Sequence, residues 1–207
     1  MKLGRLLLRA TIGGFFIGHG TQKLFGWFGG QGLKDTAGWF ESIGMKPGQV
    51  QATAAGVAET AGGAGLVLGF QTPFAASAVI AVMLTAINRV HLRNGPWNGN
   101  GGYEFNAVMI AGAATLAEIG PGKLSIDGLR KQDHSGSFWG LGSLVLGAIG
   151  AAGAHLFAES QSAGEVDAAS EATEPPEPTE TPEPTDEAPT AAETEPEAEP
   201  AGVETAE

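Results

Sequence analysis

No charged residue occurs between Thr60 and Asn88, and a run of this kind is long enough for a helix to cross a membrane. Pro73 interrupts the run, and proline ends or kinks a helix at the preceding residue. The run is long enough for one transmembrane helix but too short for two, so two helices would have to include residues beyond both of its ends. We therefore expect two antiparallel spans, at about 50–70 and 73–91, joined by a tight turn.

Three further segments have the same character. Residues 3–26 combine a basic start with an apolar middle, and no small-residue cleavage site follows, so we expect a spanning helix rather than a signal peptide. Residues 103–119 and 138–157 predict a fourth and a fifth span. These segments lack the charged outer face of a soluble amphipathic helix. The predicted fold class is all-α: an integral membrane bundle of four antiparallel transmembrane helices plus a fifth.

Charge divides the chain near Phe157. Up to that residue there are eleven Lys/Arg and seven Asp/Glu, whereas the remainder holds sixteen acidic residues and no base. Repeated proline and charge of one sign prevent the formation of a packed core. We expect a four-helix domain at 1–131, an added helix at 138–157, and a disordered acidic tail at 158–207. That tail is either a partner-binding stalk or a solvated segment with no specific role.

Basic residues in short loops indicate the orientation, because Lys and Arg are retained on the cytoplasmic side. With the N-terminus inside, five of them fall on the inner side and three on the outer: Lys2, Arg5, Lys123, Arg130 and Lys131 against Lys34, Lys46 and Arg93. The bias predicts a multi-pass protein with a cytoplasmic N-terminus. After five spans, the tail emerges on the extracytoplasmic side.

Polar residues gather in the outer half of the predicted bundle. An ionisable group in a membrane helix costs about 2.5–3.5 kcal/mol on insertion scales, so each needs a partner or a function. Helix direction brings eight residues to matched depth: His19, Gln22, Lys23, Glu59, Asn88, Arg89, Glu104 and Asn106. Lys23 and Arg89 are expected to pair with Glu59 and Glu104. The cluster either fixes helix register or forms a pocket for a quinone headgroup, a small anion or a proton relay.

Two other features carry expectations. Arg9 and Glu118 are placed to pair at the inner side, unless the Arg9 side chain extends to the interface. Small residues at a spacing of four predict close helix packing, for instance Ala10, Gly14 and Gly18, or Ser143, Gly147 and Ala151. The chain has no cysteine, no metal-ligand pattern and no nucleotide-binding loop.

Four motifs resemble the DoxX family of bacterial four-helix membrane proteins. They are His19–Gly26 (HGTQKLFG), Glu59–Gly63 (ETAGG), Gly101–Asn106 (GGYEFN) and Gly120–Asp127 (GPGKLSID), and the resemblance covers about residues 1–129. It implies a bacterial plasma membrane and an association with redox work. One relative is a subunit of a thiosulfate:quinone oxidoreductase, and a mycobacterial relative anchors a sulfurtransferase and a superoxide dismutase. By position, Lys23, Glu59 and Glu104 are the family residues retained.

The resulting functional hypothesis is an accessory or anchoring subunit of a membrane redox or oxidative-stress system that contacts quinone. The alternatives are a non-catalytic scaffold for soluble partners and, ranked last, a small-solute transporter. Expected partners are the lipid bilayer, soluble or membrane redox proteins and a second copy of the chain, but not nucleic acid. The sequence assigns no catalytic residue and requires no cofactor; any enzymatic role is that of a subunit in a quinone-linked oxidoreductase.

Overall fold

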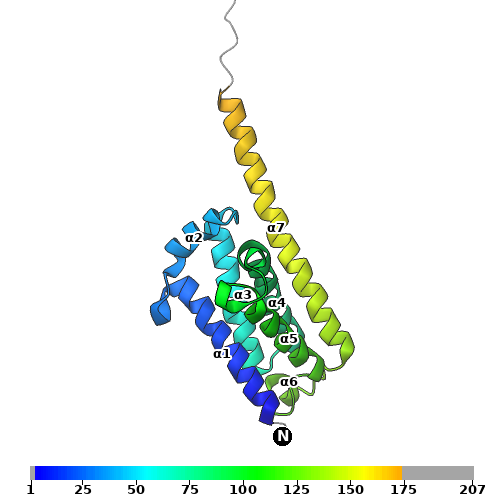
Figure 1. Cartoon of the computed structure of the whole chain (residues 1–207). Coiled ribbons are helices and arrows are strands. Elements are labelled where there is room, and N and C mark those ends of the chain that lie inside the picture. Colours follow the sequence, from blue (N-terminus) through cyan, green and yellow to red (C-terminus); the bar gives the residue numbers. More distant parts are fainter. Residues whose placement is uncertain (1–2, 174–207) are drawn as a thin grey trace, which may run out of the picture. The chain divides into compact units, whose positions relative to one another are not determined.

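The computed structural model describes residues 3–173, and every regular element in that part of the chain is helical (Figure 1). The chain divides into two compact units, Met1–Ala172 and Thr173–Glu207. The first contains the long helices α1 (Leu3–Phe25), α3 (Gly48–Leu68), α4 (Thr72–Ala86), α5 (Glu104–Ile119) and α7 (Ser137–Thr173). Its shorter elements are α2 (Gly32–Ser42), α6 (Ile126–Leu129), the π-helix η2 (Ile87–His91) and the 3-10 turns η1 (Trp27–Gly29), η3 (Leu92–Asn94) and η4 (Asn98–Asn100). The all-α prediction is confirmed for the described residues.

The long helices alternate in direction (Figure 1). The α1–α3 connection, which contains α2, and the α4–α5 connection therefore lie at one end, called here the α2 end. The α3–α4 turn and α6 lie at the other, the α6 end. Helix α7 runs along the bundle and continues past the α2 end (Figure 1).

Helices α1 and α3 approach closely because glycines face each other along their contact. A Cβ on Gly13 would lie 2.5 Å from the carbonyl oxygen of Gly63, and one on Gly63 would lie 2.5 Å from that of Gly13. Gly20 is equally crowded by Thr60, and Gly56 by Leu24. Small residues permit this backbone approach.

The small-residue stripe predicted on the first helix, Ala10, Gly14 and Gly18, is wrong, because Gly13 and Gly20 on the adjacent face of α1 make the contact with α3. A Cβ on Gly14 or Gly18 would meet no other heavy atom within 4 Å, so these glycines do not make the contact. The stripe on α7 is confirmed, because Ser143 and Ala151 are buried and a Cβ on Gly147 would lie 2.5 Å from Ile80 Cγ2.

Two apolar clusters hold the bundle. The larger joins α1, α3, α4 and α5 through residues that include Ile12, Phe16, Leu66, Ile80 and Leu116. The smaller, at the α2 end, consists of Phe40, Met45, Ala52 and Ala158, with partly buried residues around it. The second cluster ties α2 and α7 to α3.

In the part of the chain that the structure describes, two segments are long and apolar enough to cross a membrane, Thr72–Asn94 and Ser137–Gly164. Of the five predicted spans, only two are therefore confirmed as long and apolar enough: α4 with its π-helical extension, and α7. Helix α5 has 16 residues, or about 24 Å at 1.5 Å per residue, against a hydrocarbon thickness of about 30 Å. Helix α1 is longer but carries Arg5, Arg9 and Lys23.

Helix α7 continues through Thr173, so the boundary placed at Phe157 is wrong and residues 158–173 are helical rather than disordered. The uncharged core of α7 is followed by Ala, Glu and Ser residues, which are compatible with a helix that continues beyond an apolar segment. The expectation of disorder for residues 174–207 lies outside the described residues.

Arg9 organises the α6 end. It is buried and donates to four backbone carbonyls: Nε to Leu66 at 2.9 Å, Nη2 to Val67 at 2.6 Å, and Nη1 to Pro121 at 2.8 Å and Leu124 at 2.9 Å. The carbonyls of Leu66 and Val67 belong to the last turn of α3, where few backbone donors remain; Leu66 also accepts from the Gly69 amide at 3.2 Å. Arg9 thus caps α3 and fixes the loop that precedes α6.

The expected Arg9–Glu118 pair is wrong, and Arg9 does not extend to the surface either. Glu118 accepts instead from the hydroxyl of Ser137 at 3.0 Å. The fully buried Asp127 lies beside the same end, with Oδ2 3.5 Å from both the Thr72 amide and His134 Nδ1. Its own amide donates to Gly69. These contacts make the α6 end a structural node.

A candidate ligand pocket at the α2 end

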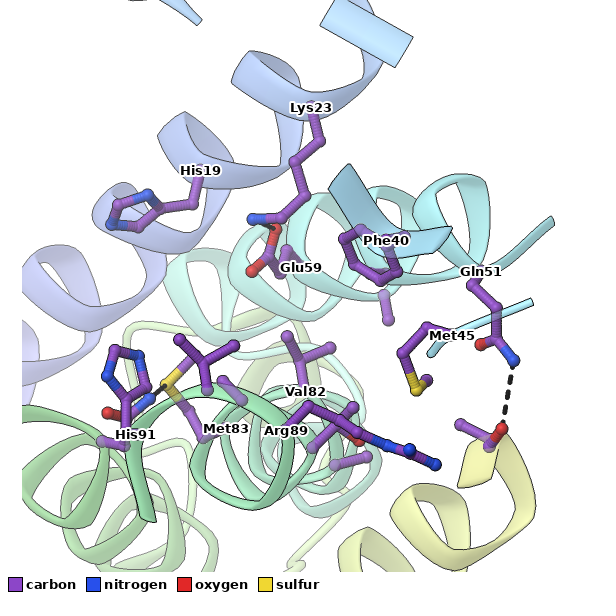
Figure 2. Close-up of a pocket in the computed structure, with 18 of the residues that line it drawn as sticks. His19, Lys23, Phe40, Met45, Gln51, Glu59, Val82, Met83, Arg89 and His91 are labelled. Carbon is purple, nitrogen blue, oxygen red and sulfur yellow. Dashed lines mark hydrogen bonds and ion pairs between the residues drawn. The ribbon is translucent and has the colours of Figure 1, made fainter. Parts of the chain in front are cut away.

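A cavity of about 390 Å³ lies inside the bundle at the α2 end (Figure 2). Helices α1, α2, α3, α4, α5 and α7 all contribute to its wall. Much of that wall is apolar, with aromatic and thioether side chains such as Phe15, Phe16, Trp39, Phe40, Met45 and Met109. Binding sites for small molecules combine this kind of lining with a few polar groups, as this cavity does.

The main polar feature of the pocket is an ion pair between α1 and α3. Lys23 Nζ lies 2.7 Å from Glu59 Oε2, which confirms this part of the predicted pairing. Glu59 faces α1 and is 2% exposed, whereas the Lys23 side chain is 22% exposed. Lys23 stands in the last turn of α1, where a cation is favoured by the helix dipole.

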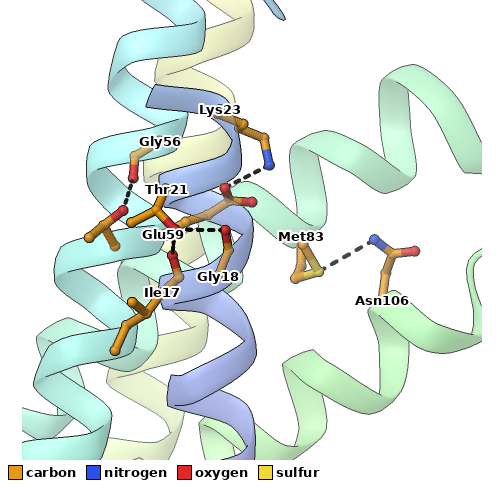
Figure 3. Close-up of polar contacts among 9 residues, drawn as sticks. Ile17, Gly18, Thr21, Lys23, Gly56, Glu59, Met83 and Asn106 are labelled. Carbon is orange, nitrogen blue, oxygen red and sulfur yellow. Dashed lines mark hydrogen bonds and ion pairs between the residues drawn. The ribbon is translucent and has the colours of Figure 1, made fainter. Parts of the chain in front are cut away.

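The hydroxyl groups near this pair are occupied within their own helices. Thr21 donates to Ile17 and Gly18 of α1, and Thr60 donates to Gly56 of α3 (Figure 3). Such back-bonding to the preceding turn is common for Ser and Thr in helices. The carboxylate of Glu59 consequently depends on Lys23 for its charge partner.

Arg89 contributes a second cation from the π-helix η2. Its Nε donates to His155 Nδ1 at 2.7 Å, and its Nη2 lies 3.8 Å from Glu159 Oε1, both on α7. A π-helical turn changes the direction in which side chains leave a helix and often marks a functional site. The predicted pairing of Arg89 with Glu104 is wrong, because the guanidinium group is directed to α7.

Asn106 and Gln51 complete the polar lining together with the two histidines. Asn106 is buried on α5 and its Nδ2 lies 3.4 Å from Met83 Sδ (Figure 3). Gln51 donates to the Ala154 carbonyl of α7 at 3.0 Å (Figure 2). His19 and His91 also line the cavity, and His91 Nδ1 lies 2.7 Å from the Gly101 carbonyl oxygen.

Five of the eight polar residues that the sequence grouped together line this pocket: His19, Lys23, Glu59, Arg89 and Asn106. The other three do not. Gln22 faces an adjoining polar cavity of about 430 Å³ that shares His19, Lys23 and Trp39. Asn88 is exposed, and Glu104 is exposed with its Oε1 accepting from the amide of Asn98.

Sequence reasoning missed the contribution of two elements. No helix is predicted between residues 26 and 50, although Leu33, Ala37 and Phe40 have the spacing of one helix face and pack into the smaller core cluster. Helix α7 was predicted as a span, but nothing in its composition indicated that Ala154 and Gly150 reach the pocket.

The arrangement offers cationic and amide donors around an apolar space. Within residues 3–173, no group of three His, Asp or Glu side chains has the geometry to hold a metal ion. The chemistry favoured by these residues is recognition of an apolar molecule with hydrogen-bond-accepting oxygens.

Within residues 3–173, this fold and pocket define an all-helical bundle with a cavity of small-molecule size, and two of its segments are long and apolar enough to cross a membrane. The DoxX family model matches residues 4–92, which supports a DoxX family protein. The matched segment runs from α1 to η2 and includes Lys23, Glu59 and Arg89, whereas the GGYEFN and GPGKLSID motifs and α7 lie beyond it. No curated protein and no solved structure matches the chain.

Proposed function

We propose that this protein binds a membrane quinone in the pocket at the α2 end and serves as an accessory subunit of a membrane redox system. One observation carries the proposal: a largely apolar cavity of about 390 Å³ has the partly buried Lys23–Glu59 pair in its wall. A quinone needs both parts of this site. Its ring needs an apolar slot, and its carbonyl oxygens need donors.

Aromatic and methionine side chains suit a flat conjugated ring. Phe16, Phe40 and Met45 are buried in the wall and form firm surfaces against which a ring can stack or pack edge-on. Lys23 supplies a charged N–H donor, and Glu59 keeps that donor in place. A hydrogen bond from a charged group is worth about 1.5–3 kcal/mol. Contacts with the apolar wall do not fix the orientation of a headgroup, and a hydrogen bond of this strength does.

The proposal is tested by purifying the full-length protein from its native membrane in mild detergent. Organic extraction and mass spectrometry should recover quinone in near-stoichiometric amount. Titration of the emptied protein with menadione, a para-naphthoquinone, should be saturable and weakened about tenfold or more by Lys23→Met. Lys34→Met, which removes an exposed lysine of α2, is the matched control. Absence of quinone together with no saturable menadione binding would reject the proposal.

The scaffold alternative predicts a different result in the same preparation. A soluble protein would be recovered in fixed ratio, and its retention would not change in Lys23→Met. The exposed aromatic residues at the α2 end, including Phe25, Trp27, Phe28 and Trp97, favour this alternative as a contact surface. A transporter would instead move a polar solute across sealed vesicles that contain the purified protein.

A further inference from the structure

Helix α7 lies outside the segment that the DoxX model matches, yet it closes the pocket. Gly150 and Ala154 form part of the wall, and Gln51 holds α7 through the Ala154 carbonyl at 3.0 Å. Small residues bring α7 close to α4, since a Cβ on Gly150 would lie 3.1 Å from that of Ala81. The site is therefore incomplete without α7.

The strongest polar contact of α7 is made with a residue that itself lines the pocket. Arg89 Nε donates to His155 Nδ1 at 2.7 Å, so His155 accepts through Nδ1 and its imidazole is neutral with the proton on Nε2. Glu159 adds a longer contact to Nη2 at 3.8 Å. Nε donates the hydrogen bond to His155, whereas the 3.8 Å contact to Glu159 is too long for one, so the Nη groups keep N–H donors that can serve a ligand.

We propose that α7, through His155, positions Arg89 as a second headgroup donor, so that the pocket selects a ligand with acceptor oxygens at two opposite ends. Figure 2 shows Lys23 reaching towards Glu59 on one side of the pocket and Arg89 lying on the other side. A para-quinone carries its two carbonyl oxygens on opposite sides of one ring. This inference rests on the proposed quinone function and adds to it the ligand class and the residue that recognises the second oxygen.

If Arg89 served only to attach α7 to the bundle, its side chain would not need to line the pocket. The attachment is already provided by buried Ala151 and Ala158 and by the Gln51 contact. Arg89 retains 20% exposure of its side chain and reaches the pocket, whereas Arg93, four residues further on, is exposed and lines no part of it. Arg93 therefore provides a matched control for loss of a cation at the same end.

The test compares menadione with tetralone, a related bicycle that has a single ketone, on the full-length protein in detergent. Arg89→Met should weaken menadione binding by about tenfold to a hundredfold and tetralone binding by clearly less. Arg93→Met should leave both unchanged. His155→Leu should reproduce the effect of Arg89→Met, and His155→Asn, whose amide oxygen can replace Nδ1 as acceptor, should restore menadione affinity. Unfolding temperature is measured for each variant, and the His155 pair carries the test if Arg89→Met does not fold.

Each outcome bears on one claim. Menadione binding that depends on Lys23 but not on Arg89 or His155 would overturn this inference and leave the proposed function standing. Equal losses for menadione and tetralone would also overturn it, since they indicate a purely structural role. No saturable menadione binding to the unaltered protein would instead reject the proposed function itself.

Discussion

Lys23 Nζ and Glu59 Oε2 lie 2.7 Å apart between α1 and α3, with the carboxylate buried and the ammonium group facing two adjoining cavities. One interaction therefore joins the first two long helices and supplies the polar end of the pocket. The proposed function assigns ligand recognition to side chains that also join α1 to α3, and experiments can separate the two roles.

Removal of one partner of this pair should cost more than removal of both. Lys23→Met leaves the buried Glu59 without a charge partner, which we expect to lower the free energy of unfolding by about 3–5 kcal/mol. The double variant Lys23→Met/Glu59→Leu should recover much of this loss. Reversible unfolding in mixed micelles measures both. Equal destabilisation by the single and double variants would show that the pair makes no coupled contribution.

Arg9 should be the most sensitive basic residue for stability. Arg9→Met removes a donor from four buried or partly buried carbonyls, of which Leu66 keeps the Gly69 amide as a second donor. A buried carbonyl without a donor costs about 1–3 kcal/mol, so we expect a loss of about 2 kcal/mol or more. Lys123→Met, an exposed change in the adjacent loop, should stay within about 0.5 kcal/mol of the unaltered protein. Comparable unfolding curves for the two variants would contradict the capping role.

Substitution of two neighbouring glycines of α1 by alanine should change the free energy of unfolding in opposite directions. Gly13→Ala places a Cβ 2.5 Å from the Gly63 carbonyl and should destabilise by about 1–3 kcal/mol. Gly14→Ala meets no other heavy atom within 4 Å and should stabilise the helix by about 0.5–1 kcal/mol. The two free energies of unfolding, measured side by side, check which face of α1 contacts α3.

The topology can be mapped with single cysteines, because the chain has none of its own. Gln31, which precedes α2, and Gln161 in α7 lie at the α2 end, while Gln132 lies at the α6 end. With five spans and a cytoplasmic N-terminus, a membrane-impermeant maleimide added to intact cells should label Gln31→Cys and Gln161→Cys but not Gln132→Cys. Labelling of Gln132→Cys alone would reverse the orientation.

The Lys23–Glu59 pair was predictable because helix direction alone brings the end of α1 to the depth of residue 59. The direction in which Arg89 points was not. It follows from the π-helical turn, which redirects the side chain, and from an acceptor on α7 that lies 66 residues away. The alternating direction of the helices indicates how deep each residue lies along the bundle. The helix faces are nearly uniform in Gly and Ala, so the sequence does not indicate which helix a given side chain contacts.

Arg9 illustrates a second limit. Its partners are backbone carbonyls at the end of α3 and in the loop after α5, and no side chain in the sequence marks them. Charge and depth along the bundle therefore predict Glu118 as the partner of Arg9 and give no sign of these carbonyls. Helix α2 was missed for the opposite reason, since glycine and proline on both sides obscured the spacing of Leu33 and Phe40.

The most direct test of the central claim uses Trp39, which lines the pocket. A variant with Trp27, Trp97 and Trp139 changed to phenylalanine leaves Trp39 as the only tryptophan, and a second variant that retains only Trp139 reports from the α6 end. Menadione is titrated while fluorescence is recorded. We predict saturable quenching of Trp39 that Lys23→Met weakens, with only weak, non-saturating quenching of Trp139. Identical, non-saturating quenching of both tryptophans would contradict a quinone site in this pocket.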